Sequence, residues 1–191
     1  MLHLASKSPR RQQLLQQLGV DFSVIAVEVE ECRREGESPR AYVTRVARDK
    51  AHAGLASLDA GASGAVVVLG ADTEVVLDGE VFGKPGDTEA AARMLHRLSG
   101  RTHDVISAVW LVAVDRELSD VCNSQVQFAS LDQATIAAYV ATAEPFGKAG
   151  GYAIQGRGAA LIAELRGSYS GVMGLPLFET SRLLRQFGIA S

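Results

Sequence analysis

The sequence has few cysteines, no long apolar run and little net charge, and each absence excludes a class of protein. Cys32 and Cys122 lie far apart and form no CxxC pair, so we expect free thiols in a reducing compartment. No apolar run has the roughly 20 residues of a membrane-spanning helix. A net charge of −3 supplies no overall positive field, which argues against nucleic acid as a partner. The N-terminus, MLHLASKSPRR, lacks the apolar core of a signal peptide, and we expect a cytoplasmic protein without a membrane partner.

Several catalytic and nucleotide-binding signatures are also missing. The chain has no GxxxxGK[ST] loop, no GxGxxG after a predicted strand and no GxSxG turn. Its four histidines have no spacing typical of zinc ligands. A phosphate site in this chain must therefore combine separate lysines and arginines with a helix end.

The patterns that are present predict an α/β protein in which residues 1–191 form a single domain. Asp78-Gly79 predicts a tight hairpin that joins short apolar runs at 75–77 and 80–82. Further strands are expected at 2–5, 20–27, 66–69, 105–114, 117–131 and 159–165. Helices are expected at 9–19, 39–54, 87–99 and 132–142 and from residue 176 onward, and loops at 28–37, 55–65, 144–158 and 168–175.

The stretch from Val66 to Pro85 predicts the centre of the functional site. Its first apolar run stops at Gly70-Ala71-Asp72-Thr73, which would place Asp72 at the end of a buried strand. A carboxylate there is costly unless it is used. Because the hairpin delivers Gly83-Lys84-Pro85, we expect Asp72 and Lys84 to face one cleft and to act on a phosphorylated ligand. The alternative is that Asp72 caps a turn and Lys84 is a solvated rim residue.

A second candidate is the anion site at the start of the first predicted helix. Ser8 is a good N-cap, and Pro9 suits the first helical position. Arg10 and Arg11 then occupy a first turn in which the helix dipole disfavours cations. With the Ser6 hydroxyl and the free backbone donors, these cations indicate an anion site. The alternative is that both arginines pair with acidic residues elsewhere.

Three further sets of residues each have two interpretations, a functional one and a purely structural one. The acidic residues at 28, 30 and 31 could hold a divalent cation or simply be solvated. Lys50 lies on or beside a buried helix stripe, so its ammonium either points into the cleft or reaches solvent. Lys148, Gln155 and Arg157 lie in a glycine-dense segment that either approaches a ligand closely or forms an ordinary surface loop.

Seven short motifs, each weak alone, together cover nearly the whole chain. They are SKSPRR at 6–11, GADT at 70–73, GKP at 83–85, LSGRTH at 98–103, KAGGY at 148–152, IQG at 154–156 and VMGLPL at 172–177. In this order the sequence resembles the Maf family of nucleoside triphosphate pyrophosphatases. The resemblance implies a fold of the inosine-triphosphatase type, an elongated mixed sheet flanked by helices, with two lobes around a central cleft. It also suggests a homodimer.

The resemblance further implies that a nucleoside triphosphate is hydrolysed to the monophosphate and pyrophosphate with a divalent metal, Mg²⁺ or Mn²⁺. Asp72 corresponds to the proposed proton acceptor. Arg10, Thr73 and Gln155 match the branch that prefers dTTP and UTP, whereas a branch acting on 7-methyl-GTP tends to have Trp, Gln and Glu there. One departure is Gly147, where close relatives often carry Asp, so an acidic role at that position is in doubt.

Each candidate residue then has an expected role. Asp72, together with Glu31, is expected to hold the metal. The residues expected to bind phosphate are Ser6, Ser8, Arg11, Lys50, Lys84 and Lys148. House-cleaning of modified nucleotides and a link to cell-division arrest are possible roles. The alternatives are a pyrophosphatase for 7-methyl-GTP or another modified purine triphosphate, and a non-enzymatic nucleotide-binding regulator of septum formation.

Overall fold

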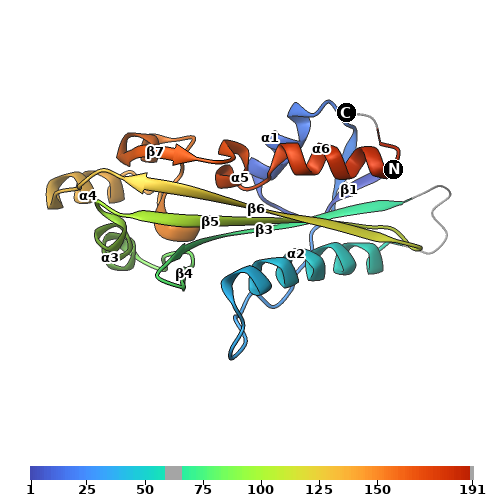
Figure 1. Cartoon of the computed structure of the whole chain (residues 1–191), viewed down its shortest axis with the longest axis horizontal. Helices are drawn as coiled ribbons and strands as arrows, with labels where there is room; N and C mark the ends of the chain where they lie inside the picture. Colours follow the sequence, from blue (N-terminus) through green and yellow to red (C-terminus); the bar gives the residue numbers. More distant parts are fainter. Residues whose placement is uncertain (59–65, 190–191) are drawn as a thin grey trace.

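The computed structural model describes residues 1–58 and 66–189, and a long mixed sheet runs along its longest axis (Figure 1). The strand order is β2-β1-β3-β5-β6-β7, and β4 pairs with β3 beyond the end of β1. β1 is parallel to both β2 and β3, and the remaining pairs are antiparallel. The strands are β1 Leu2–Leu4, β2 Phe22–Val24, β3 Val67–Leu77, β4 Glu80–Phe82, β5 Thr102–Val112, β6 Glu117–Phe128 and β7 Ile162–Arg166.

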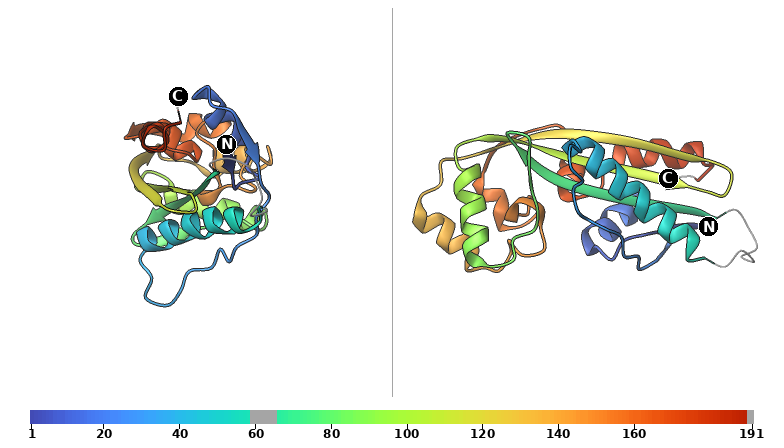
Figure 2. Two further views of the ribbon diagram at one scale, coloured as in Figure 1. Left: turned by 90° about the vertical axis from the view of Figure 1, so that its right-hand side faces the viewer. Right: turned by 90° about the horizontal axis from the view of Figure 1, so that it is seen from below.

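Helices cover the sheet differently at its two ends (Figures 1 and 2). At one end, α1 and α6 pack against one face and α2 packs against the other. At the opposite end, α3 and α4 enclose a second core against β3, β5 and β6. The helices are α1 Pro9–Gln17, α2 Pro39–Ala56, α3 Thr88–Leu98, α4 Gln133–Val140, α5 Tyr169–Met173 and α6 Leu177–Gln186.

The alternation of side chains along β3 assigns its residues to the two faces of the sheet. Leu69 packs in the core shared with α1 and α6, whereas Val68 packs in a core with residues of α2. Gly70 permits an especially close approach of α2, because a Cβ at this position would lie 2.2 Å from the Ala47 carbonyl oxygen. The even-numbered residues of β3 therefore face α2, and α2 lies close enough for its side chains to reach the strand.

The expected mixed sheet with flanking helices is confirmed, as is the hairpin at Asp78-Gly79. The prediction that the strand stops at residues 70–73 was wrong, because β3 continues through Asp72 to Leu77. Its pairing with β5 extends unbroken from Val68 to Val76, which keeps the backbone extended across the glycine. Asp72 thus lies within a strand, and the alternative that it caps a turn is also wrong.

Four smaller predictions need correction. The strand expected at 159–165 begins later, since Arg157–Leu161 forms a 3-10 helix before β7. The loop expected at 168–175 contains α5, whose first turn is capped by the Ser168 side chain. The strand expected at 20–27 is limited to Phe22–Val24, because only these residues pair with β1. Of the loop expected at 55–65, residues 55 and 56 belong to α2, and 59–65 lie outside the described residues.

No helix within the described ranges is both long enough and apolar enough to cross a bilayer. Both cysteines are free thiols, in agreement with the expectation from their spacing.

Candidate active site

A gap along one edge of β3 creates the site. β1 pairs with this edge only as far as Leu69, and β4 pairs with it only from Val75 onward. The two short strands therefore end facing each other, and residues 70–74 of β3 have a neighbour on the β5 side alone. The segments that leave these strands, Ser6 to Arg11 after β1 and Gly83-Lys84 after β4, flank the gap. A cleft of about 590 Å³ opens here, lined by residues from both segments.

Asp72 lines this cleft and is 5% exposed. Lys50 Nζ of α2 donates to its Oδ1 over 2.8 Å, and Arg11 Nη2 lies 3.9 Å from the same oxygen. The other oxygen, Oδ2, is buried and has no hydrogen-bond partner among the residues that the structure describes. The alternative that Lys50 reaches solvent is wrong, since its residue is 8% exposed.

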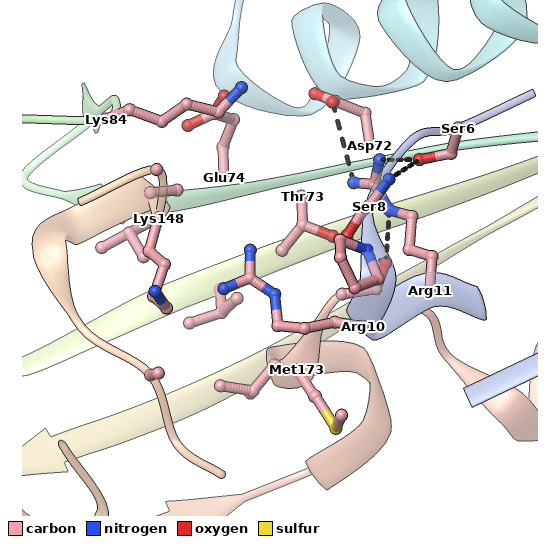
Figure 3. Close-up of a pocket in the computed structure, with 18 of the residues that line it drawn as sticks. Ser6, Ser8, Arg10, Arg11, Asp72, Thr73, Glu74, Lys84, Lys148 and Met173 are labelled. Carbon is pink, nitrogen blue, oxygen red and sulfur yellow. Dashed lines mark hydrogen bonds and ion pairs between the residues drawn. The ribbon is translucent and has the colours of Figure 1, made fainter. Parts of the chain in front are cut away.

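The start of α1 is arranged differently from the other helix starts that bear a capping side chain. Ser38, Asp87 and Asp132 each accept a hydrogen bond from a backbone N–H of their own helix. Ser8 occupies the N-cap position of α1 but makes no such bond. The side chain of Ser8 lines the cleft together with the start of the helix, so both remain available to an anion (Figure 3).

Arg11 is fixed by contacts on both sides of the cleft (Figure 3). Its Nε donates to the Gly174 carbonyl over 2.9 Å, and its Nη1 donates to Ser6 Oγ over 3.4 Å. The Ser8 N–H also donates to Ser6 Oγ. Within the described residues, an acidic partner is recorded for Arg11 but none for Arg10. The alternative that both arginines pair with acids therefore holds for Arg11 alone.

Glu31 connects two of the predicted phosphate-binding lysines. Its Oε1 lies 2.6 Å from Lys50 Nζ, and its Oε2 lies 3.2 Å from Lys84 Nζ. Burial opposes ionisation of this carboxyl, but the hydrogen bonds from both lysines outweigh burial and lower its pKa to about 2. Lys84 has a side chain that is 58% exposed, so it is a rim residue that nevertheless lines the cleft.

The three predicted specificity residues lie along the same cleft. Arg10 points toward Lys148 from the opposite wall (Figure 3). Burial, followed by the charge of Arg10, lowers the pKa of Lys148, and the opposite charge of Glu144 offsets this only in part. Thr73 shares a hydrogen bond of 2.8 Å with Ser107 Oγ, and Gln155 is exposed to the cleft. Arg157 does not line the cleft, and its backbone N–H donates to Glu144.

Sequence reasoning missed one carboxyl group, that of Glu74. It lies two residues beyond Asp72 on β3, and therefore on the same face of the sheet. Burial and then the charge of Asp72 raise its pKa to about 8. If the strand had been expected to continue past residue 73, the two-residue periodicity of a β-strand would have placed Glu74 on the same face as Asp72.

The charged groups of the cleft suit a polyanion that brings a divalent cation. Within the described residues no three His, Cys, Asp or Glu side chains form a ready-made metal cage. Asp72 Oδ2 and Glu74 Oε2 are nevertheless buried acceptors without a partner. This donor set fits Mg²⁺ or Mn²⁺, which bind one or two carboxylates and complete their coordination with water and phosphate oxygens.

Two curated relatives and one solved structure are similar to this chain. A curated relative from Xanthomonas oryzae pv. oryzae (strain MAFF 311018), named dTTP/UTP pyrophosphatase, is 58% identical over 98% of this chain and 99% of its own length. A relative from Xylella fastidiosa (strain M23), named nucleoside triphosphate pyrophosphatase, is 57% identical over 98% of both chains. The solved structure of the Staphylococcus aureus Ham1 protein covers 67% of this chain and 71% of its own at 16% identity, and its TM-score of 0.41 is too low to carry an argument.

The family model for Maf-like proteins matches residues 1–187, which include every residue that lines the cleft. This chain belongs to the Maf family.

Proposed function

We propose that this protein is a nucleoside triphosphate pyrophosphatase that hydrolyses dTTP and UTP to the monophosphate and pyrophosphate. One observation carries the proposal. A buried carboxylate with an unpartnered oxygen, that of Asp72, shares a cleft with cations from separate segments of the chain. The names of the relatives add the substrate class.

In this proposal the cations bind the triphosphate and neutralise its charge. Arg11 and Lys50 lie beside Asp72, and Lys84 and Lys148 reach the cleft from adjoining segments joined by the hydrogen bond from Gly150 N–H to the Gly83 carbonyl. The Ser8 hydroxyl and the first N–H groups of α1 supply neutral donors, and Ser6 holds the Arg11 guanidinium in place. Because Glu31 ties up both Lys50 and Lys84, the incoming phosphates replace its carboxylate as their partner.

Asp72 accepts the proton of the attacking water. The water oxygen forms a bond to the α-phosphorus, the bond from that phosphorus to the bridging oxygen breaks, and pyrophosphate leaves. Lys50 keeps the carboxylate oriented through Oδ1, which leaves Oδ2 directed at the reacting groups. A divalent cation, when bound by Asp72 with Glu31 nearby, would polarise the phosphate oxygens and lower the pKa of a bound water.

Arg10, Thr73 and Gln155 are proposed to select the base. Gln155 presents both a donor and an acceptor, as the edge of a uracil or thymine ring requires. Thr73 is held by Ser107, which fixes a small side chain beside the nucleotide. We further propose that residues 1–191 act as one domain, and the homodimer and the cytoplasmic location stay predictions.

The test is metal-dependent release of pyrophosphate from a panel of nucleoside triphosphates that includes dTTP, UTP, dCTP, GTP, ITP and 7-methyl-GTP. We expect kcat/KM for dTTP and UTP to exceed that for each purine nucleotide by at least about tenfold. A preference for a purine nucleotide would contradict the substrate assignment. Release of orthophosphate instead of pyrophosphate would contradict the assigned bond.

A further inference from the structure

Glu74 is a carboxyl group that the proposed mechanism leaves without a role. It lines the cleft from β3, and its Oε2 is buried with no hydrogen-bond partner. No ion pair is recorded for it in the described part of the chain, although Lys84 lies on the same side of the cleft (Figure 3). An acidic group in such a position is unfavourable unless a ligand uses it.

Asp72, which lies next to Glu74 on the same face of β3, also has a buried carboxylate oxygen without a partner in the described part of the chain. Asp72 is 5% exposed, and its Oδ2 also lacks a partner, even though Lys50 and Arg11 both lie close to Oδ1. The two unpartnered oxygens thus come from residues i and i+2 of one strand, whose side chains project in the same direction. Two carboxylates placed in this way repel each other, and a cation between them removes the repulsion.

Glu31 differs from Asp72 and Glu74 in its contacts and in the segment that carries it. Both of its oxygens are bound to lysine ammonium groups, its side chain is 39% exposed, and it belongs to a segment outside the helices and strands. Asp72 and Glu74, by contrast, stand on an extended strand that pairs with β5 along its full length through this region. The strand is therefore the more rigid platform for a metal ligand.

We propose that Glu74 is a direct ligand of the divalent cation in this cleft and binds it together with Asp72. The inference rests on the proposed function only in that this function brings the cation and the phosphates to the cleft. Hard cations such as Mg²⁺ and Mn²⁺ prefer carboxylate oxygens and complete their shell with water and phosphate. Lys50 and Lys84 then bind the phosphates once these replace Glu31 as their partner.

Binding of Mn²⁺ alone, without nucleotide, tests the proposal directly. Free Mn²⁺ is measured by electron paramagnetic resonance for the wild type, for Glu74→Gln and for Glu89→Gln. Glu89 pairs with Arg93 on the surface of α3, so its variant makes the same chemical replacement outside the cleft. We expect Glu74→Gln to weaken the Mn²⁺ affinity at least about tenfold and Glu89→Gln to leave it within about twofold. Equal affinity in the wild type and Glu74→Gln would overturn the proposal.

Thermal unfolding separates a ligand from a residue that only supports the fold. Mn²⁺ should raise the Tm of the wild type and of Glu89→Gln but shift that of Glu74→Gln much less. Without metal, Glu74→Gln should unfold no earlier than the wild type, because glutamine keeps the volume and removes the buried acid. A Glu74→Gln variant that is destabilised without metal and gains as much from Mn²⁺ as the wild type would assign Glu74 a structural role.

A second variant and one activity measurement complete the test. If Glu74→Gln does not fold, Glu74→Met replaces it, since methionine has a similar length and adapts to irregular surroundings. If the wild type releases pyrophosphate from dTTP but Glu74→Gln binds Mn²⁺ normally, only the present inference fails. If Mn²⁺ binding depends on Glu74 but no nucleoside triphosphate is hydrolysed, the proposed function fails and the metal site stands.

Discussion

Two buried polar centres on neighbouring strands of one sheet show how differently a folded chain can use a polar group. Asp72 of β3 is 5% exposed and His103 of β5 is 2% exposed. Lys50 and Arg11 surround the Asp72 carboxylate, and Phe128 and Tyr152 surround the imidazole of His103 with edge-on ring contacts. The first centre opens into the cleft, whereas the second belongs to the core beneath α3 and α4.

The two centres differ in the charge of the buried group. Burial lowers the pKa of His103 to about 4, so the ring is neutral near pH 7, and its Nε2 shares a hydrogen bond of 2.8 Å with the Tyr152 hydroxyl. A neutral ring can be packed at little cost. The Asp72 centre instead gathers several charged side chains. Among the described residues each centre has one buried atom without a partner, but that of His103, Nδ1, belongs to a neutral ring, whereas Oδ2 of Asp72 belongs to a carboxylate. Buried charges gathered in this way destabilise the folded state unless a ligand compensates them, which indicates that this region binds a charged ligand.

The largest expected effect is that of Asp72→Asn. Pyrophosphate release from dTTP should fall by about 10³-fold or more, because the variant loses the proton acceptor and a metal-binding charge. The fold should be retained, as measured by circular dichroism, because asparagine keeps the shape of the side chain. Activity above roughly one tenth of the wild-type rate would remove Asp72 from the mechanism.

His103→Ala should lower stability and leave activity nearly unchanged, the opposite of what we expect for Asp72→Asn. Loss of the ring contacts and of the partner of the Tyr152 hydroxyl should lower the free energy of unfolding by about 2–4 kcal/mol. The kcat of the folded variant should stay within about threefold of wild type, since no group of His103 lines the cleft. Denaturant unfolding and initial rates measure the two quantities, and an unchanged unfolding midpoint would contradict the packing role.

The same histidine predicts a pH dependence of stability. Its pKa is lowered from 6.5 when unfolded to about 4 when folded, so the unfolded chain binds an extra proton between these values. The stabilisation from neutral His103 is therefore fully present above pH 6.5 and is lost as the pH falls toward 4, by on the order of 3 kcal/mol at most. His103→Asn should show a correspondingly shallower loss of stability over this range. Parallel curves for both proteins would show that other groups cause the acid sensitivity.

The smallest predicted effect concerns the link between Thr73 and the short helix α5. Ser107 Oγ donates to the Gly171 carbonyl over 2.6 Å and shares a hydrogen bond with Thr73. Ser107→Ala should lower kcat/KM for dTTP about five- to tenfold, the equivalent of one hydrogen bond, through misplacement of Thr73. Ser119→Ala, an exposed change on the neighbouring strand, serves as the control. Equal kinetics in both variants would show that Thr73 needs no support from Ser107.

Much of the local structure could be predicted from the residues themselves. Ser38, Asp87 and Asp132 cap their helices, and Asp78-Gly79 forms the expected hairpin, because caps and tight turns depend on a few adjacent residues. The ordered motifs also led to the family, which the matched model bears out. The candidate residues for phosphate, specificity and catalysis all line one cleft, including Glu31 and Lys148.

The features that could not be predicted from the sequence depend on which strands pair with each other. The sequence determined the longer helices, the Asp78-Gly79 turn and the set of charged residues, since these follow from local chemistry, whereas the short helix α5 was expected as a loop. Only the tertiary structure decided that β3 continues past Gly70, because its pairing with β5 is a contact between distant parts of the chain. That pairing, with the gap between β1 and β4, set Asp72 and Glu74 on one face and turned Lys50 inward. Local periodicity carries no information about the partner of a strand edge, and the site lies where that edge is left free.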